Sequence, residues 1–414
     1  MQQLLWTYPV ATLSTAAFYG LMLLLAIPAT RGRIVPWLAP VPPHQKHLQS
    51  FDTFRGFAAF LVAIGHAWWA SYPVFAKTQY KFQFMAYDGK AVPMFAVLSG
   101  FLIYRSVLNI NSIQELRSYV VRRFFRIYPT YLLSIALCLT TAQYVPMYYD
   151  SASTFFLSDL LMFKVLNRSG AQANPVTWSL YIEVAFYVAL PLFALTLGRR
   201  RAIIAAAIGV VLMTIAEQPG REFSLWTFFL IGILASELSW TDLYKQPLAA
   251  WLSLLAGLGL LVYDFGGPDH DWMAHLGFNT LRMDYQTLGL GLGCSLLLAA
   301  LPHVRAAAKA LEILPLRLLG VTSYSLYITH FFYILANFPE LQRFNLAGTP
   351  DMYQHFQTLP QMPWWYLPFL FMPGCILWAI VSYVLVERPG MALGRRLLRG
   401  RKAQPAIGAL QPAE

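Results

Sequence analysis

The sequence has little charge and almost no cysteine. Only 12% of its 414 residues are Asp, Glu, Lys or Arg, whereas charged residues make up about a quarter of an average soluble protein. A soluble fold of this length needs more charge to cover its surface. The 57% of hydrophobic residues therefore favours the lipid bilayer as the solvent. The same composition excludes a disordered chain and a disulfide-stapled secreted scaffold.

The three cysteines lie in separate apolar stretches, with no second cysteine, or histidine at metal-ligand spacing, beside them. Cys138, Cys294 and Cys375 are therefore predicted to be inert core residues that form neither a disulfide nor a metal site. The chain is also basic, with a net charge of +11, which in a soluble protein suggests a nucleic-acid partner. In a membrane protein such an excess reports topology, so we expect no nucleic acid.

Apolar runs of about 20 residues, which are needed to cross about 30 Å of hydrocarbon, recur along nearly the whole chain. They predict an all-α, polytopic transmembrane bundle of about eleven spans. Of the 30 Lys and Arg residues, 22 fall on one side of these spans and 8 on the other. The richer side is predicted to be cytoplasmic, which places the N-terminus outside and the C-terminus inside. The predicted spans are residues 8–28, 54–73, 91–109, 127–147, 178–198, 202–216, 223–240, 247–263, 284–302, 318–338 and 364–387.

Ionisable side chains deep in a span are costly, and they mark functional sites by default. His66, Glu183 and His330 are the clear cases. His66 follows Arg55 by eleven residues, which places both on one helix face about 16 Å apart. Each residue also has a structural explanation. His66, and His330 together with Tyr327, could form hydrogen bonds between helices. The Arg55 side chain could extend to the lipid headgroups, and the Glu183 carboxylate could complement the positive end of a helix dipole.

Arg122, Arg123 and Arg126 come directly before the fourth span on the predicted cytoplasmic side. Such a cluster usually reports positive-inside charge. Because Arg55 opens another span at the same depth, the four guanidinium groups are also suited to binding a phosphate-rich ligand. Acyl-coenzyme A fits this arrangement, with phosphates at one end and a thioester at the other. A neutral His66 in the membrane is then suited to take a proton from an attacking hydroxyl.

The sequence also resembles the integral-membrane acyltransferase-3 family. FDTFRGFAAFLVAIGH is similar to its Arg-ten-residues-His signature, VPMFAVLSGFLIYR to its Ser-Gly-Phe segment, and RRFFRIYP to its Arg-x-x-Arg motif. NPVTWSLYIEVAFYVALPL resembles its Trp-Ser-Leu…Glu segment, and SYSLYITH its Ser-Tyr-Ser-Leu-Tyr…His segment. The five motifs keep the family's order, and the resemblance extends from about residue 50 to 390.

The resemblance implies an O-acyltransferase that moves an acyl group, most often acetyl, from cytoplasmic acyl-CoA to a hydroxyl of an extracytoplasmic glycan or lipid-linked sugar. No metal is expected. Carried over position by position, together with the residues named above, the candidate catalytic residues are His66 as general base, Arg55, and Glu183, which would orient His66 or the acceptor. The candidate donor-binding residues are Arg122, Arg123, Arg126, Ser99, Tyr327 and His330.

The chain departs from the family at two points. The family usually has ten spans, so we expect residues 1–49 to add an N-terminal transmembrane helix and a cytoplasmic linker. An acyltransferase domain over 50–390 and a basic cytoplasmic tail over 391–414 follow, without a fused soluble transferase domain. Many members carry a second acid after the first, where this chain has Val184, which puts in doubt a role that needs two carboxylates.

Several alternatives stay open at this stage. A non-enzymatic carrier of a glycan or acyl donor is one, and an acyl-enzyme relay through Ser99 or His66 is another. We expect a multi-pass protein of the bacterial cytoplasmic (inner) membrane. The sequence does not specify the acceptor, the acyl chain, or whether the chain forms a homo-oligomer.

Overall fold

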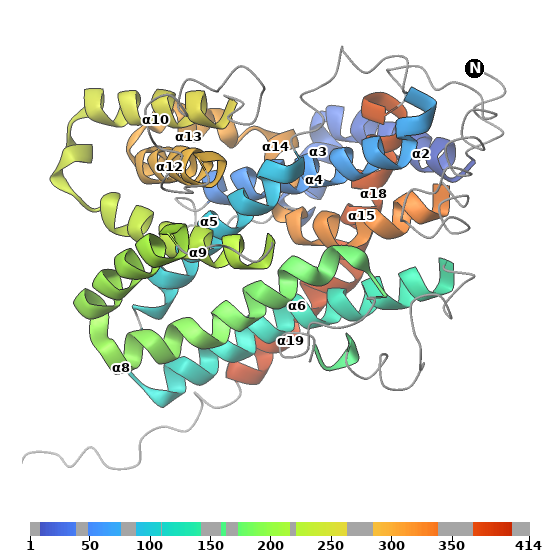
Figure 1. Ribbon diagram of the computed structural model, residues 1–414. Helices are drawn as coiled ribbons and strands as arrows, with labels where there is room; N and C mark the ends of the chain where they lie inside the picture. The colour runs from blue at the N-terminus through green and yellow to red at the C-terminus, as the bar shows by residue number, and fades with distance from the viewer. Residues whose placement is uncertain are drawn as a thin grey trace, which may run out of the picture.

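The computed structural model describes residues 9–38, 49–75, 88–108, 110–141, 159–162, 173–215, 221–262, 285–337 and 367–399, and every regular element within these ranges is helical (Figure 1). The α-helices are α2 (Pro9–Ala26), α3 (Pro28–Leu38), α4 (Gln49–Phe75), α5 (Asp88–Val107), α6 (Ile113–Thr141), α8 (Trp178–Ile215), α9 (Arg221–Leu238), α10 (Pro247–Val262), α12 (Tyr285–Ala300), α13 (Arg305–Leu311), α14 (Leu314–Val321), α15 (Ser323–Asn337), α18 (Met372–Ser382) and α19 (Arg388–Arg399). The short elements are the 3-10 turns η6 (Pro175–Thr177), η7 (Asp242–Lys245) and η10 (Leu301–His303), and the π-helical turns η11 (Leu367–Phe371) and η12 (Tyr383–Glu387).

The all-α class is confirmed, and helices occupy each of the eleven predicted ranges. Within the described residues, four helices are long and apolar enough to cross a membrane, and two bent helix pairs raise the number to as many as six. The count of eleven spans and their orientation remain predictions. The four helices are Pro9–Ala26, Lys90–Val107, Pro175–Leu192 and Pro368–Leu398.

Some predicted spans are bent. The range 318–338 holds two helices, α14 and α15, whose axes differ by 75°. The helix over Gly289–His303 is followed by α13 at 101°. Inside α8, Gly198 has a φ of 72°, a left-handed conformation that glycine adopts without a steric penalty. This break lies at the last residue of the predicted span 178–198, just before the predicted span 202–216.

Helices α5 and α9 cross with their backbones in contact. A Cβ atom on Gly100 would lie 2.1 Å from the carbonyl oxygen of Phe229, and one on Gly232 would lie 2.1 Å from that of Val97. Small residues at such crossings let membrane helices approach closely. The contact fixes the segment of α5 that carries Ser99, next to Gly100.

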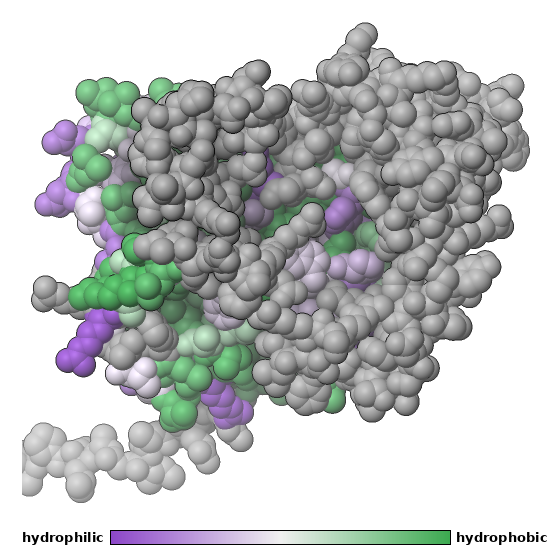
Figure 2. All heavy atoms as spheres, viewed as in Figure 1, coloured by the Kyte–Doolittle hydropathy of each residue, from purple (hydrophilic) through white to green (hydrophobic). Residues whose placement is uncertain are grey.

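Large hydrophobic side chains remain exposed along the outside of the bundle. Leu248 is 71% exposed on α10 and Leu192 is 58% exposed on α8. Figure 2 shows hydrophobic side chains at the left edge of the view, over α8, α9 and α10, with hydrophilic side chains among them. An apolar exterior of this extent suits contact with lipid, and together with the apolar helices it indicates a membrane protein.

Candidate active site

A cavity lies between six helices, α4, α5, α6, α8, α9 and α15. It contains about 700 Å³ of empty space, part of which is continuous with open solvent. Its polar lining consists of Arg55, Ser99, Arg123, Arg126, Ser179, Glu183, Tyr187, Tyr324 and Tyr327. Its apolar lining consists of Val92, Phe95, Ala96, Ile127, Leu180, Leu225 and Phe229.

Helical periodicity explains why these side chains meet. Ser179, Glu183 and Tyr187 are spaced four residues apart on α8, and Tyr324 and Tyr327 are three apart on α15. Residues three or four apart share one face of a helix. Of the α8 set, only Glu183 was predicted to be a site residue, although this spacing was a signal for Ser179 and Tyr187 as well.

Most of the residues predicted to bind the donor line this cavity. Arg55 comes from α4, Ser99 from α5, and Arg123 and Arg126 from α6. Arg122, in contrast, is exposed and is not part of the lining. The predicted cluster of four arginines is therefore a set of three at the cavity.

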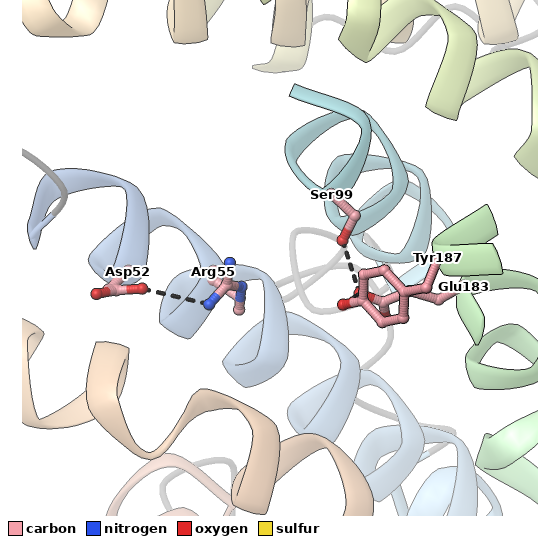
Figure 3. A network of polar contacts seen from close by, with 5 residues as sticks. All are labelled: Asp52, Arg55, Ser99, Glu183 and Tyr187. Carbon is pink, nitrogen blue, oxygen red and sulfur yellow. Dashed lines mark hydrogen bonds and ion pairs between the residues drawn. The ribbon is translucent and has the colours of Figure 1, made fainter. Parts of the chain in front are cut away.

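Glu183 is held by two hydroxyl groups from different helices. Ser99 Oγ on α5 donates to Glu183 Oε1 over 2.9 Å, and Tyr187 Oη on α8 donates to the same oxygen. Figure 3 shows Ser99 and Tyr187 converging on Glu183, with Asp52 and Arg55 facing them from α4. The carboxylate thus joins α5 to α8 in the cavity wall.

The three arginines differ in their partners. Arg55 Nη1 lies 3.2 Å from Asp52 Oδ1. The Arg123 guanidinium lies 4.9 Å from the centre of the Tyr187 ring. Arg126 has no hydrogen bond or ion pair to any residue that the structure describes. Three guanidinium groups from two helices, only one of them ion-paired within those residues, give the cavity capacity for an anionic ligand.

His66 and His330, which are 264 residues apart in sequence, are hydrogen-bonded to each other. His66 Nδ1 lies 2.9 Å from His330 Nε2, and the two rings are nearly parallel, with centroids 5.1 Å apart. His330 is completely buried, whereas His66 is partly exposed. Both residues were predicted site residues, but in different roles, His66 as general base and His330 in donor binding.

The hydrogen bonds of the pair define which nitrogen carries each proton. His330 Nδ1 lies 3.2 Å from the carbonyl oxygen of Leu326, and a carbonyl only accepts, so Nδ1 donates. In a neutral His330, Nε2 is then an acceptor and His66 Nδ1 donates to it. This leaves the basic lone pair of a neutral His66 on Nε2.

Tyr327 lies between the cavity and the histidine pair. Its hydroxyl donates to the carbonyl oxygen of Val176 over 2.9 Å and lies 2.6 Å from Ser179 Oγ. Its ring centre lies 5.3 Å from that of Phe95 and 6.0 Å from that of His330. The predicted site residues therefore form two groups, arginines and Glu183 in the cavity and histidines beyond it, with Tyr327 in contact with both.

The buried carboxylate of Glu387 was not predicted from the sequence. This residue is 2% exposed at the end of η12, and it accepts a hydrogen bond from Ser325 Oγ over 2.7 Å. Arg126 and Arg55 lie within electrostatic range. In the sequence, Glu387 is the last residue of the predicted span 364–387. An acidic residue at that position resembles the charged residues that commonly flank a membrane span.

The described residues contain no group of three or more His, Cys, Asp or Glu side chains placed to hold a metal ion. The cysteines are buried in three different helices, α6, α12 and α18. The polar side chains at the described site carry hydroxyl, carboxylate, imidazole and guanidinium groups.

Comparison with known proteins assigns the matched region to one family. The model of the family described as acyltransferase domain matches residues 48–385. This range begins at α4 and ends within η12, so it contains the cavity and the histidine pair, and leaves α2 outside.

The individual relatives have low sequence identity to this chain, and two of the three are named as acyl-transferring proteins. A Komagataeibacter xylinus protein whose name describes a membrane-bound transacylase, BcsY, is 26% identical over 372 residues, which cover 83% of each chain. An Acidianus two-tailed virus protein named as an acetyltransferase is 28% identical over 48% of this chain and 58% of its own. Nodulation protein 10 of Rhizobium leguminosarum bv. viciae is 26% identical over 35% of this chain and 44% of its own. No solved structure matches the chain.

Proposed function

The chain belongs to the acyltransferase-3 family of membrane enzymes, and from this premise we propose that it transfers an acyl group from cytoplasmic acyl-CoA to a hydroxyl of an extracytoplasmic glycan or lipid-linked sugar. Acetyl is the acyl group that we favour. Membership of an acyltransferase family gives no support to the alternative of a carrier without chemistry.

The observation that carries the proposal is the convergence of Arg55, Arg123 and Arg126 on one cavity. Guanidinium groups bind phosphate in a bidentate manner and keep their charge at any physiological pH. The nucleotide and pyrophosphate of CoA would bind at these arginines. The pantetheine arm would extend past Tyr327 toward the histidine pair, which brings the thioester to His66.

We propose that His66 is the general base and His330 its positioning residue. His66 Nε2 takes the proton of the acceptor hydroxyl while that oxygen attacks the thioester carbonyl. A carbon–oxygen bond forms, the carbon–sulfur bond breaks, and the imidazolium returns the proton to the CoA thiolate. The orienting role that the sequence suggested for Glu183 toward His66 passes to His330, because the hydroxyl groups of Ser99 and Tyr187 bind Glu183 in the cavity wall.

The proposal includes the eleven-span topology. The arginine cavity would open to the cytoplasm, where acyl-CoA is made, and the acceptor would reach the histidines from the outside. The distribution of 22 basic residues against 8 supports this orientation. A bacterial inner membrane is the location that we propose.

The direct test uses the purified protein in proteoliposomes with acetyl-CoA labelled in the acetyl group and a panel of glycosides with free hydroxyls. We expect a labelled glycoside and one equivalent of free CoA thiol for each acetyl transferred. Mass spectrometry of envelope glycans with and without the protein would then identify the natural acceptor as the sugar that loses one acyl group. A folded protein that releases no thiol and labels no glycoside would refute the proposal.

A further inference from the structure

Helix α2 lies outside the residues matched to the family, yet its side chains bind the backbone of the last membrane helix. Thr15 Oγ1 donates to the carbonyl oxygen of Leu370, and Tyr19 Oη donates to that of Phe369 over 3.0 Å. Both carbonyls belong to the π-helical turn η11. Figure 1 shows α2, α15 and α18 side by side.

The backbone of η11 explains why these donors matter. A π-helical turn interrupts the regular α-helical hydrogen-bond register. Pro373, four residues after Phe369, has no N–H, so the carbonyl of Phe369 lacks its α-helical donor. In lipid, no water replaces such a donor, so a protein side chain that donates to the carbonyl is favoured. Thr15 and Tyr19 supply donors at this turn.

The same three helices meet at Gly374. A Cβ atom there would lie 2.1 Å from Tyr333 Oη on α15 and 2.9 Å from Ser14 Cβ on α2. Trp378 Nε1 on α18 donates to Ser14 Oγ over 3.2 Å. Tyr333 follows His330 by three residues on α15. Helices α2 and α18 therefore meet α15 about one helical turn from this histidine.

Helix α2 also shares a core with the helix that carries His66. Ala11 is fully buried in one cluster with Ala63, Ala67 and Tyr333. Ala63 and Ala67 flank His66 on α4. Helix α2 therefore belongs to the same hydrophobic core as the residues around both histidines.

We infer that α2 is a positioning element for the histidine pair, and that Thr15 and Tyr19 are its positioning residues. By fixing η11 and α18, these two side chains hold α15 in the place that sets the 2.9 Å contact between His66 and His330. The inference rests on the proposed function. It assigns a role to the N-terminal helix that lies outside the family match.

The test compares steady-state acyl transfer by the full chain and by the double variant Thr15→Val with Tyr19→Phe, which removes two hydroxyl groups and keeps the apolar shape. Small displacements of reacting groups have large kinetic effects, so we expect kcat to fall by about tenfold. The KM for acetyl-CoA should stay within about twofold, because the arginine cavity lies in other helices. The single variant Thr15→Ser, which keeps the hydroxyl group and leaves Tyr19 unchanged, should have most of the wild-type kcat.

The matched control is Leu13→Ala on the same helix, at a side chain that is 71% exposed; kcat should not change. A double variant with wild-type kcat would overturn the inference. So would a fall in kcat that equals the loss of folded protein in the same preparation, because unfolding lowers the apparent kcat and leaves KM unchanged. If the double variant does not purify, Tyr19→Phe alone, at a side chain 43% exposed, is judged by the same split between kcat and KM.

The two proposals fail in distinguishable ways. A wild-type protein that transfers no acyl group overturns the proposed function and, with it, this inference. A wild-type protein that transfers normally, with variants that match it, overturns only the role of α2.

Discussion

The arginine cavity and the histidine pair hold their side chains in different ways. In the cavity, charged groups from several helices surround empty space, and Arg126 has no hydrogen bond within the described residues. The histidines are held instead by two successive hydrogen bonds, one from His330 to the backbone and one between the rings. An open charged site is suited to binding a ligand, whereas a fixed imidazole is suited to proton transfer at one defined atom. This difference predicts that substitutions in the two groups affect different kinetic constants.

The largest effect is expected at His66. His66→Asn removes the proposed base, so kcat should fall on the order of 10³-fold, with the KM for acetyl-CoA little changed. Steady-state transfer assays measure both constants. His303→Asn is the matched control, because His303 contacts the carbonyl oxygen of Ser239 and lies in neither group. Unchanged kcat in His66→Asn would remove the histidine pair from the chemistry.

The next effect is expected at His330. His330→Phe keeps a ring of similar size but removes the acceptor for His66 Nδ1, so the tautomer and the orientation of His66 are no longer fixed. Loss of such an orienting partner should lower kcat by about 10²-fold. His330→Gln offers an amide oxygen as a replacement acceptor and should recover part of the rate. Equal rates in the two variants would mean that His330 contributes packing and not orientation.

A smaller effect, on the other constant, is expected in the cavity. Arg126→Ala removes hydrogen bonds to an anionic group, each worth about 1.5–3 kcal/mol, so the KM for acetyl-CoA should rise about ten- to a hundredfold. At saturating donor, kcat should stay near the wild-type value. Arg122→Ala on the same helix is the matched control, since Arg122 is exposed and does not line the cavity. Equal changes in KM for the two variants would refute the assignment of this cavity to the donor.

The smallest effect is expected at Asp52. Its side chain is 43% exposed, and its ion pair with Arg55 faces solvent on one side. Exposed ion pairs contribute about 0.2–1 kcal/mol, so Asp52→Asn should change the donor KM by less than about fivefold, in a titration at fixed ionic strength. A change as large as that of Arg126→Ala would show that Asp52 takes a direct part in the cavity.

The sequence predicted the helices and the cavity residues better than it predicted their partners. Arg55, Ser99, Glu183 and Tyr327 lie in motifs whose periodicity and depth are visible along one helix, and the structure brings them to one cavity. The sequence does not specify a contact between different helices. For this reason it gave no indication that His66 binds His330 rather than Glu183.

Two further features depended on backbone geometry. The bend of 75° between α14 and α15 lies within an apolar run that reads as a single span, because hydropathy reports length and not direction. The binding of η11 by Thr15 and Tyr19 needs a π-helical turn, which no composition signal marks. Glu387 was missed because a carboxylate at a span boundary resembles a solvated charge until its burial is known.

The central claim is that donor binding and proton transfer lie in the two different groups. Equilibrium binding of labelled acetyl-CoA and single-turnover transfer, measured on the same preparations of wild type, His66→Asn and Arg126→Ala, test it most directly. We predict that His66→Asn binds the donor like wild type and transfers the acyl group on the order of 10³-fold more slowly, whereas Arg126→Ala binds weakly and transfers at the wild-type rate once saturated. Full transfer by His66→Asn, or loss of binding and transfer together in both variants, would contradict it.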